Sequence, residues 1–158
     1  MRGMFENKRL KQRTIIHKFK KMQAINTERN KRIALRWMDL ISEGAVDQIC
    51  EMTAPQWTMH GGLPNLPAGP EGVRTLFKSF GKVDQKWTVN DIIAEGDKVV
   101  VRATNICYQE SFFGVETKGR QQEFTAIFIH KIDNEMIAET WRNADDLGRV
   151  LQLGAKVA

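Results

Sequence analysis

The chain of 158 residues has few cysteines and histidines, and both shortages exclude classes of functional site. Cys50 and Cys107 lie far apart among apolar residues, a pattern that indicates buried thiols in a reducing compartment and argues against a disulfide framework. His17, His60 and His130 show no metal-ligand spacing. A phosphate-binding glycine loop, a dinucleotide-binding fingerprint and a Gly-x-Ser-x-Gly elbow are also absent. We therefore expect neither a metal nor a cofactor.

The chain also lacks a long run of apolar residues, which excludes transmembrane architectures. Lysines interrupt the first 25 residues every few positions, which argues against a secretory signal. The first serine is Ser42, whereas organelle transit peptides are rich in serine. A cytoplasmic protein is expected. Eight Phe and four Trp nevertheless supply enough large side chains for the core of one globular domain.

The net charge of +5 comes entirely from the N-terminus. Residues 1–25 carry eight Lys or Arg and one acid, a charge of +7, whereas residues 26–158 carry 16 bases and 18 acids, a charge of −2. The remainder of the chain therefore has no electrostatic reason to bind phosphate backbones. We divide the chain into a basic N-terminal extension, residues 1–25, and a domain, residues 26–158.

Apolar residues recur among the lysines of the extension partly at helical spacing: Phe5, Ile15, Ile16, Phe19, Met22 and Ile25. Such a basic amphipathic helix is one route to nucleic-acid or membrane contact. A solvated helical arm that packs on a partner subunit is a second interpretation, and a natural start at Met22 is a third. The sequence leaves the three open.

Within the domain, apolar periodicity predicts helices first and long strands afterwards. The helical segments are 27–44, with Thr27 as N-cap and Trp37 on the apolar stripe, a short piece around 46–52, and one that begins at Pro70 and includes Phe80. The strands are 57–60 and two hairpins, 87–93 with 99–108 and 123–132 with 136–144, and a last short segment begins at Asp145. This order favours an α+β fold in which helices cover one face of a curved antiparallel sheet, like a cone with an open mouth.

The last hairpin concentrates candidate site residues. With Asp133 and Asn134 as its turn, Phe128 is expected opposite Glu139, and one face collects the following residues: Phe124, Phe128, His130, Glu139, Trp141 and Asp145. An ionised carboxylate in an apolar site must be paired or protonated, so its presence there suggests function. The alternative is that Asp145 only caps the last helix and Glu139 points to solvent or a salt bridge; Asp146 could equally be the cap.

Several segments in order resemble the SnoaL-like polyketide cyclase, or ester cyclase, family over residues 28–155. They are Gly69–Val73, Ile92–Arg102, Phe112–Gly114 with Gly119 and Arg120, Glu139–Trp141, Asp145, and Gln152–Gly154. The resemblance implies the cone-shaped α+β fold of nuclear transport factor 2, an apolar pocket inside the cone, and homodimers joined through the outer sheet face. The characterised cyclases of this family close a ring without a cofactor, so the resemblance also implies an activity that needs none.

By this resemblance the catalytic aspartate falls on Asp145, and a pocket histidine falls on His60. Tyr108 stands where many relatives have a histidine, so we do not infer a polyketide substrate for this chain from the resemblance. We expect Asp145 to act as acid and base on a small apolar or carbonyl-containing ligand, with a pKa raised by the surrounding apolar side chains. His60, Tyr108 or His130 would donate to the developing enolate oxygen.

The expected ligand contacts are Trp37, Phe124, Phe128, His130, Glu139 and Trp141. The reaction class stays open between a cyclase, isomerase or dehydratase and a hydrolase that activates water. The competing interpretation is a dimeric module of the same fold that binds a small ligand without turnover.

Overall fold

The structure, a computed structural model, describes residues 2–156 of the chain and the side chains of residues 12–156. Its elements follow in the order α1 (Arg2–Glu43), α2 (Val46–Glu51), β1 (Thr53–His60), α3 (Pro70–Phe80), β2 (Val83–Glu95), β3 (Lys98–Gln109), β4 (Ser111–Phe112), β5 (Val115–Glu116), β6 (Gln122–Asp133), β7 (Met136–Ala144) and α4 (Asp146–Gln152). Among these residues, no helix is long and apolar enough to span a membrane.

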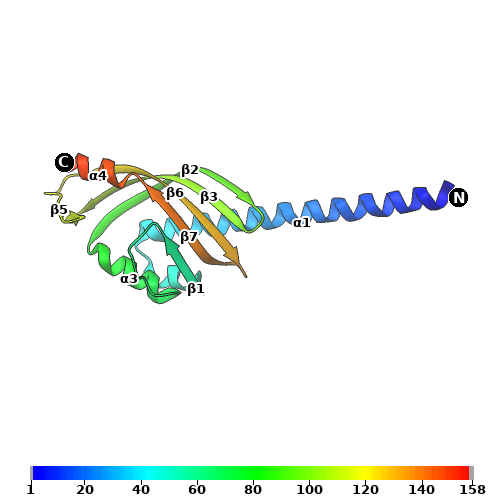
Figure 1. Cartoon of the computed structure of the whole chain (residues 1–158), viewed down its shortest axis with the longest axis horizontal. Coiled ribbons are helices and arrows are strands. Elements are labelled where there is room, and N and C mark those ends of the chain that lie inside the picture. Colours follow the sequence, from blue (N-terminus) through cyan, green and yellow to red (C-terminus); the bar gives the residue numbers. More distant parts are fainter. Residues whose placement is uncertain (1, 157–158) are drawn as a thin grey trace.

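The predicted α+β fold is confirmed. The long strands form one curved sheet in the order β1-β7-β6-β3-β2, and helices lie on its concave side (Figure 1). Neighbours among β2, β3, β6 and β7 are antiparallel, as expected from their hairpins. The edge strand β1 instead runs parallel to β7, so the sheet is mixed. No hairpin joins β1 to β7, since α3 and three long strands intervene, and so no turn imposes an antiparallel pairing.

Helix α1 runs without a break from the basic extension into the domain, and it extends far beyond the sheet (Figure 1). The predicted start at Thr27 is therefore wrong. Its hydroxyl donates to the Ala24 carbonyl oxygen at 2.9 Å, a bond typical of a threonine inside a helix. The part of α1 that follows packs against the sheet and buries Trp37, Met38 and Leu40, so tertiary contact holds this end of the helix.

The core lies between α1 and the concave face of the sheet. Trp57, Val99, Val101 and Ile137 are at most 1% exposed there. Burial of each such side chain stabilises the fold by roughly 1.5–3 kcal/mol. Because this gain is large, the alternation of apolar residues along the strands predicts which side chains face the core. The helix that begins at Pro70 is confirmed as α3.

The turn of the last hairpin differs from the prediction. Asp133 pairs with Met136, and the turn residues are Asn134 and Glu135, with φ of 48° and 64°. Two positive φ values define the turn type whose twist matches a hairpin. The register then shifts at a bulge, because Ile132 pairs with Ile137 and Lys131 with Glu139, which leaves Ala138 unpaired.

Together the turn and the bulge move the pairing by an odd number of residues. Phe128 lies opposite Arg142 and not opposite Glu139. Because side chains alternate along a strand, Arg142 joins Phe128 on the inner face, and Glu139 and Trp141 move to the outer face. The predicted gathering of Glu139 and Trp141 with Phe128 is therefore wrong.

Candidate functional site

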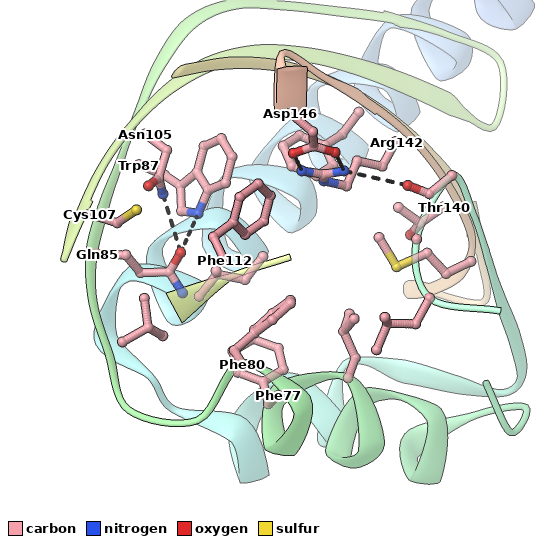
Figure 2. A pocket seen from close by; sticks show the side chains of 18 of the residues that line it. Phe77, Phe80, Gln85, Trp87, Asn105, Cys107, Phe112, Thr140, Arg142 and Asp146 are labelled. Carbon is pink, nitrogen blue, oxygen red and sulfur yellow. Dashed lines mark hydrogen bonds and ion pairs between the residues drawn. The ribbon is translucent and has the colours of Figure 1, made fainter. Parts of the chain in front are cut away.

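A cavity of about 250 Å³ lies between the concave face of the sheet and α3 (Figure 2). Most of its wall is apolar, with large contributions from Trp37, Trp57, Phe77, Trp87, Phe124 and Phe128. Trp37, Phe124 and Phe128 were expected to contact a ligand, and the structure places all three there. Such a volume suits a ligand of about two fused rings.

The loop after β1 closes one side of the cavity and depends on a glycine. Gly61 has a φ of 74°, and a Cβ there would lie 2.0 Å from the carbonyl oxygen of Arg142. Only glycine allows the loop to approach β7 so closely. Leu63 and Pro64 follow and line the cavity.

The cavity holds a carboxylate and a guanidinium joined by two hydrogen bonds (Figure 2). Arg142 Nη1 donates to Asp146 Oδ2 at 2.8 Å, and Nη2 donates to Oδ1 at 2.7 Å. Arg142 comes from the inner face of β7, and Asp146 is the first residue of α4, four residues later. Both side chains are mostly buried, at 18% and 26% exposed. Among the residues that the structure describes, Asp146 is the single acid in the cavity wall.

A cluster of amides lies on the wall formed by β2 and β3 (Figure 2). Gln85 Oε1 accepts from Trp87 Nε1 at 3.1 Å and from Asn105 Nδ2 at 3.2 Å. Asn105 is fully buried, and its Oδ1 has no partner in the described part of the chain. The cluster therefore offers a ligand a carbonyl acceptor, because buried polar groups are seldom left unpaired.

A second arginine, Arg149 of α4, also lines the cavity and is 5% exposed. Its Nη2 donates at 3.0 Å to the amide oxygens of Gln109 and Gln122. The guanidinium stacks on the rings of Phe112 and Phe124, 3.5 and 4.1 Å from their centroids. Burial lowers the pKa of Arg149, and it still remains charged at neutral pH.

Asp145 does not lie in the cavity. It is exposed and is the N-cap of α4, where its Oδ1 accepts from the Gly148 backbone N–H at 2.8 Å. The premise that apolar side chains surround Asp145 is therefore wrong, and the alternative of a helix cap describes its position. Asp146, not Asp145, faces the cavity. The spacing of four residues between Arg142 and Asp146 gave no signal for this, because Arg142 lies in a strand and the i, i+4 rule applies within a helix.

His130 lies behind the cavity wall. It is completely buried, its ring stacks on Phe128 at 5.9 Å, and its Nδ1 lies 3.1 Å from Thr140 Oγ1. Trp57 Nε1 donates to the same hydroxyl at 3.1 Å. Burial lowers the pKa of His130 to about 4, so the ring is neutral at pH 7. Trp37, Phe128 and Thr140 contact this histidine and themselves line the cavity, whereas His130 does not line it. The expected direct contact of His130 with a ligand is therefore not what the structure shows.

The other expected site residues lie outside the cavity. His60 and Glu139 are bonded at 2.8 Å, and the His60 ring stacks on Trp141 with centroids 5.1 Å apart. This follows from the parallel pairing of β1 with β7, which sets His60 opposite Trp141. Tyr108 is 45% exposed, and its hydroxyl donates to Gln121 at 2.6 Å. In the described part of the chain, no group of His, Cys, Asp and Glu side chains is placed to hold a metal ion.

A curved sheet closed by helices around an internal cavity defines a cone-shaped α+β domain. The chain belongs to the SnoaL-like polyketide cyclase family, whose model matches residues 31–153. The basic part of α1 lies outside the match. A search of the curated proteins finds no match to this chain.

Solved structures of the same fold come from several bacteria. TsrD from Streptomyces laurentii is 26% identical, with a TM-score of 0.72, over 82% of this chain and 97% of TsrD. A SnoaL-like polyketide cyclase from Agrobacterium tumefaciens is 20% identical, with a TM-score of 0.66, over 77% of this chain and 95% of that one. An LEH-like epoxide hydrolase from M. tuberculosis is 15% identical, with a TM-score of 0.66, over 81% and 91%. The shared fold thus includes proteins named for different reactions.

Proposed function

We propose that the cavity carries out cofactor-independent acid/base chemistry on a small, largely apolar carbonyl compound, with Asp146 as the group that accepts and returns the proton. The observation that supports this most strongly is the placement of one carboxylate, bonded to Arg142, in an otherwise apolar cavity. A carboxylate in such surroundings is a common form of enzymatic base. Asp146 replaces Asp145 in this role because Asp145 is an exposed helix cap.

In the proposed step, an Asp146 oxygen takes a proton from the carbon next to the carbonyl. The C–H bond breaks, an O–H bond forms on Asp146, and the electron pair moves onto the carbonyl oxygen as an enolate. Negative charge thus passes from Asp146 to the ligand. Arg142 was paired with the carboxylate at 2.7 and 2.8 Å, so it is close enough to stabilise the charge in its new position. Asp146 then returns the proton to carbon or to a leaving oxygen.

This chemistry fits a cyclase, an isomerase or a dehydratase, and the same carboxylate could activate water in a hydrolase. The family's name supports the first group. The hydrogen-bond donors proposed for the enolate oxygen differ from the three side chains that the sequence suggested. His60 and Tyr108 lie outside the cavity, and His130 is neutral and behind Thr140, so Arg142 and the Gln85 amide are the proposed donors to the oxygen.

The test uses 2-tetralone, a two-ring ketone whose C1 hydrogens exchange slowly with water. Its binding is followed by tryptophan fluorescence, because Trp37, Trp57 and Trp87 line the cavity. Exchange of its hydrogens in D₂O is followed by proton NMR. The wild type should accelerate exchange, and Asp146→Asn should lower the catalysed rate about 100-fold or more while binding is kept. Binding without accelerated exchange would contradict the proposal and favour a ligand-binding module without turnover.

A further inference from the structure

The buried cation Arg149 lacks a carboxylate partner. In the described part of the chain, no acidic oxygen lies within 4.0 Å of its guanidinium, although Arg142 nearby is paired with Asp146. Two amide oxygens and the sulfur of Cys107, at 3.5 Å, accept from its Nη2. Burial raises the pKa of the Cys107 thiol, so this neighbour is neutral at pH 7 and supplies no negative charge.

The remaining donors of Arg149 are unused. Its buried Nε has no hydrogen-bond partner among the described residues, and its Nη1 donates to no described atom either. Phe112 and Phe124 stack on the guanidinium, so its hydrogen bonds must form at its edges. A planar guanidinium with free edge donors is the group that binds a carboxylate through paired hydrogen bonds.

The net charge of the cavity wall also favours a negatively charged ligand. Among the described lining residues, two arginines and one aspartate are charged at neutral pH, so two cations and one anion leave a net charge of +1. A buried cation is costly unless an anion compensates it, and the nearby Asp146, which favours the charged form of Arg149, is already bonded to Arg142. One monoanion in the cavity would neutralise the wall.

We propose that the cavity takes a monoanionic carboxylic acid of about two fused rings, and that Arg149 binds its carboxylate. This inference rests on the proposed function, because it names the class of compound that would occupy the same cavity. Arg149 is assigned as a specificity-determining residue: it selects the anionic compound, whereas Asp146 and Arg142 handle the proton. The apolar wall holds the rings.

The test compares two ligands of the same shape, 2-naphthoate and the neutral 2-naphthamide, by isothermal titration calorimetry at pH 7 on the full chain. The wild type should bind 2-naphthoate at least 10-fold more tightly than 2-naphthamide. Arg149→Gln should bring the two dissociation constants to within about two-fold, and Arg149→Lys should keep part of the preference. Arg120→Gln is the matched control and should leave the ratio unchanged, since Arg120 binds backbone carbonyls of α4 outside the cavity.

A second variant tests the proposal even if Arg149→Gln fails to fold. Gln109→Glu keeps the side-chain shape and places a carboxylate where Arg149 Nη2 now finds an amide oxygen at 3.0 Å. The new ion pair neutralises the cavity wall at the cost of the bond from Gln109 Nε2 to the Ser111 carbonyl oxygen, and the preference for 2-naphthoate should be lost. A wild type that binds both ligands equally would overturn the proposal, and so would a preference that survives in Gln109→Glu.

The two proposals fail in different experiments. A preference for 2-naphthoate without exchange of 2-tetralone hydrogens would refute the acid/base function and leave the anion site standing. Exchange of 2-tetralone hydrogens without a preference for 2-naphthoate would refute the anion site alone.

Discussion

Phe128 on β6 lies directly opposite Arg142 on β7, and this pairing decides which side chains of the last hairpin reach the cavity. Opposite residues face the same side of a sheet, so Arg142 points inward and its neighbour Trp141 points outward. Arg142 then bonds Asp146, the residue that begins α4. The position of the cavity carboxylate is thus a consequence of the hairpin register.

The pair of Arg142 and Asp146 should show strong thermodynamic coupling. We expect Arg142→Gln to destabilise the fold by about 1–2 kcal/mol, because it leaves a mostly buried carboxylate without its charged partner. Adding Asp146→Asn should restore part of this loss, since the unpaired charge is then gone. Urea denaturation of the four proteins in a double-mutant cycle measures the coupling. Additive effects of the two substitutions would show that the ion pair contributes nothing.

The turn at Asn134 and Glu135 should be improved by glycine. Glu135 has a φ of 64°, and glycine adopts positive φ without strain, so Glu135→Gly should stabilise the fold by about 0.5 kcal/mol. The gain is limited because Glu135 also bonds Arg29 at 2.9 Å in an exposed ion pair. Glu135→Ala is the control, since it removes the ion pair and keeps the strain. Thermal denaturation should rank glycine above wild type and alanine below it; the reverse order would refute the assigned turn.

The fold could be predicted because its signals are local and repeated. Alternation along residues 99–108, together with Gly96 and Asp97 between two strands, predicts a hairpin, and β2 and β3 form it. Pro70 with apolar residues at helical spacing predicts α3. The parallel edge strand β1 escaped prediction, because its partner β7 is distant in the chain and no turn links them.

The site could be predicted only in part. Trp37, Phe124 and Phe128 line the cavity because apolar residues at the right period face inward whatever the details of a turn. Glu139 and Trp141 do not, because one bulged residue reverses the faces of β7, and His60 lies opposite Trp141 on the same outer face. Asp145 lies outside the cavity because it caps α4. A single bulged residue such as Ala138 leaves little trace in the sequence, because the apolar pattern on either side of it is unchanged.

His130 should make the fold sensitive to mild acid. Burial lowers its pKa from 6.5 to about 4. Between these two pH values the ring is protonated in the unfolded chain and neutral in the folded chain. Stability is therefore unaffected by this group above pH 6.5 and falls as the pH drops towards 4, by roughly 3 kcal/mol in total.

Urea denaturation between pH 7 and 4.5 tests this contribution. His130→Gln should flatten the pH dependence, whereas His17→Gln, at an exposed position of α1, is the control and should keep the slope of the wild type. Equal slopes for wild type and His130→Gln would show that the buried ring does not govern the response.

We propose that the outer sheet face forms a homodimer. Ile129 lies opposite Trp141 there, and Ile127 on the same face is 45% exposed. Light scattering after size-exclusion chromatography should give the mass of a dimer, and Ile127→Glu should give a monomer, because a charge would be buried in the contact. Phe19→Glu, on the exposed basic part of α1, should leave the dimer intact. A dimer lost in Phe19→Glu and kept in Ile127→Glu would place the contact on α1 instead.

The most direct test of the central claim compares two adjacent aspartates. Asp145→Asn and Asp146→Asn differ by one position, yet the first removes the charge of an exposed helix cap and the second removes that of the cavity carboxylate. Asparagine also caps helices, so Asp145→Asn should fold normally. In the 2-tetralone exchange measurement, Asp145→Asn should keep the wild-type rate within about two-fold, and Asp146→Asn should lose about 100-fold or more. Loss of exchange in Asp145→Asn, with Asp146→Asn unaffected, would contradict the account.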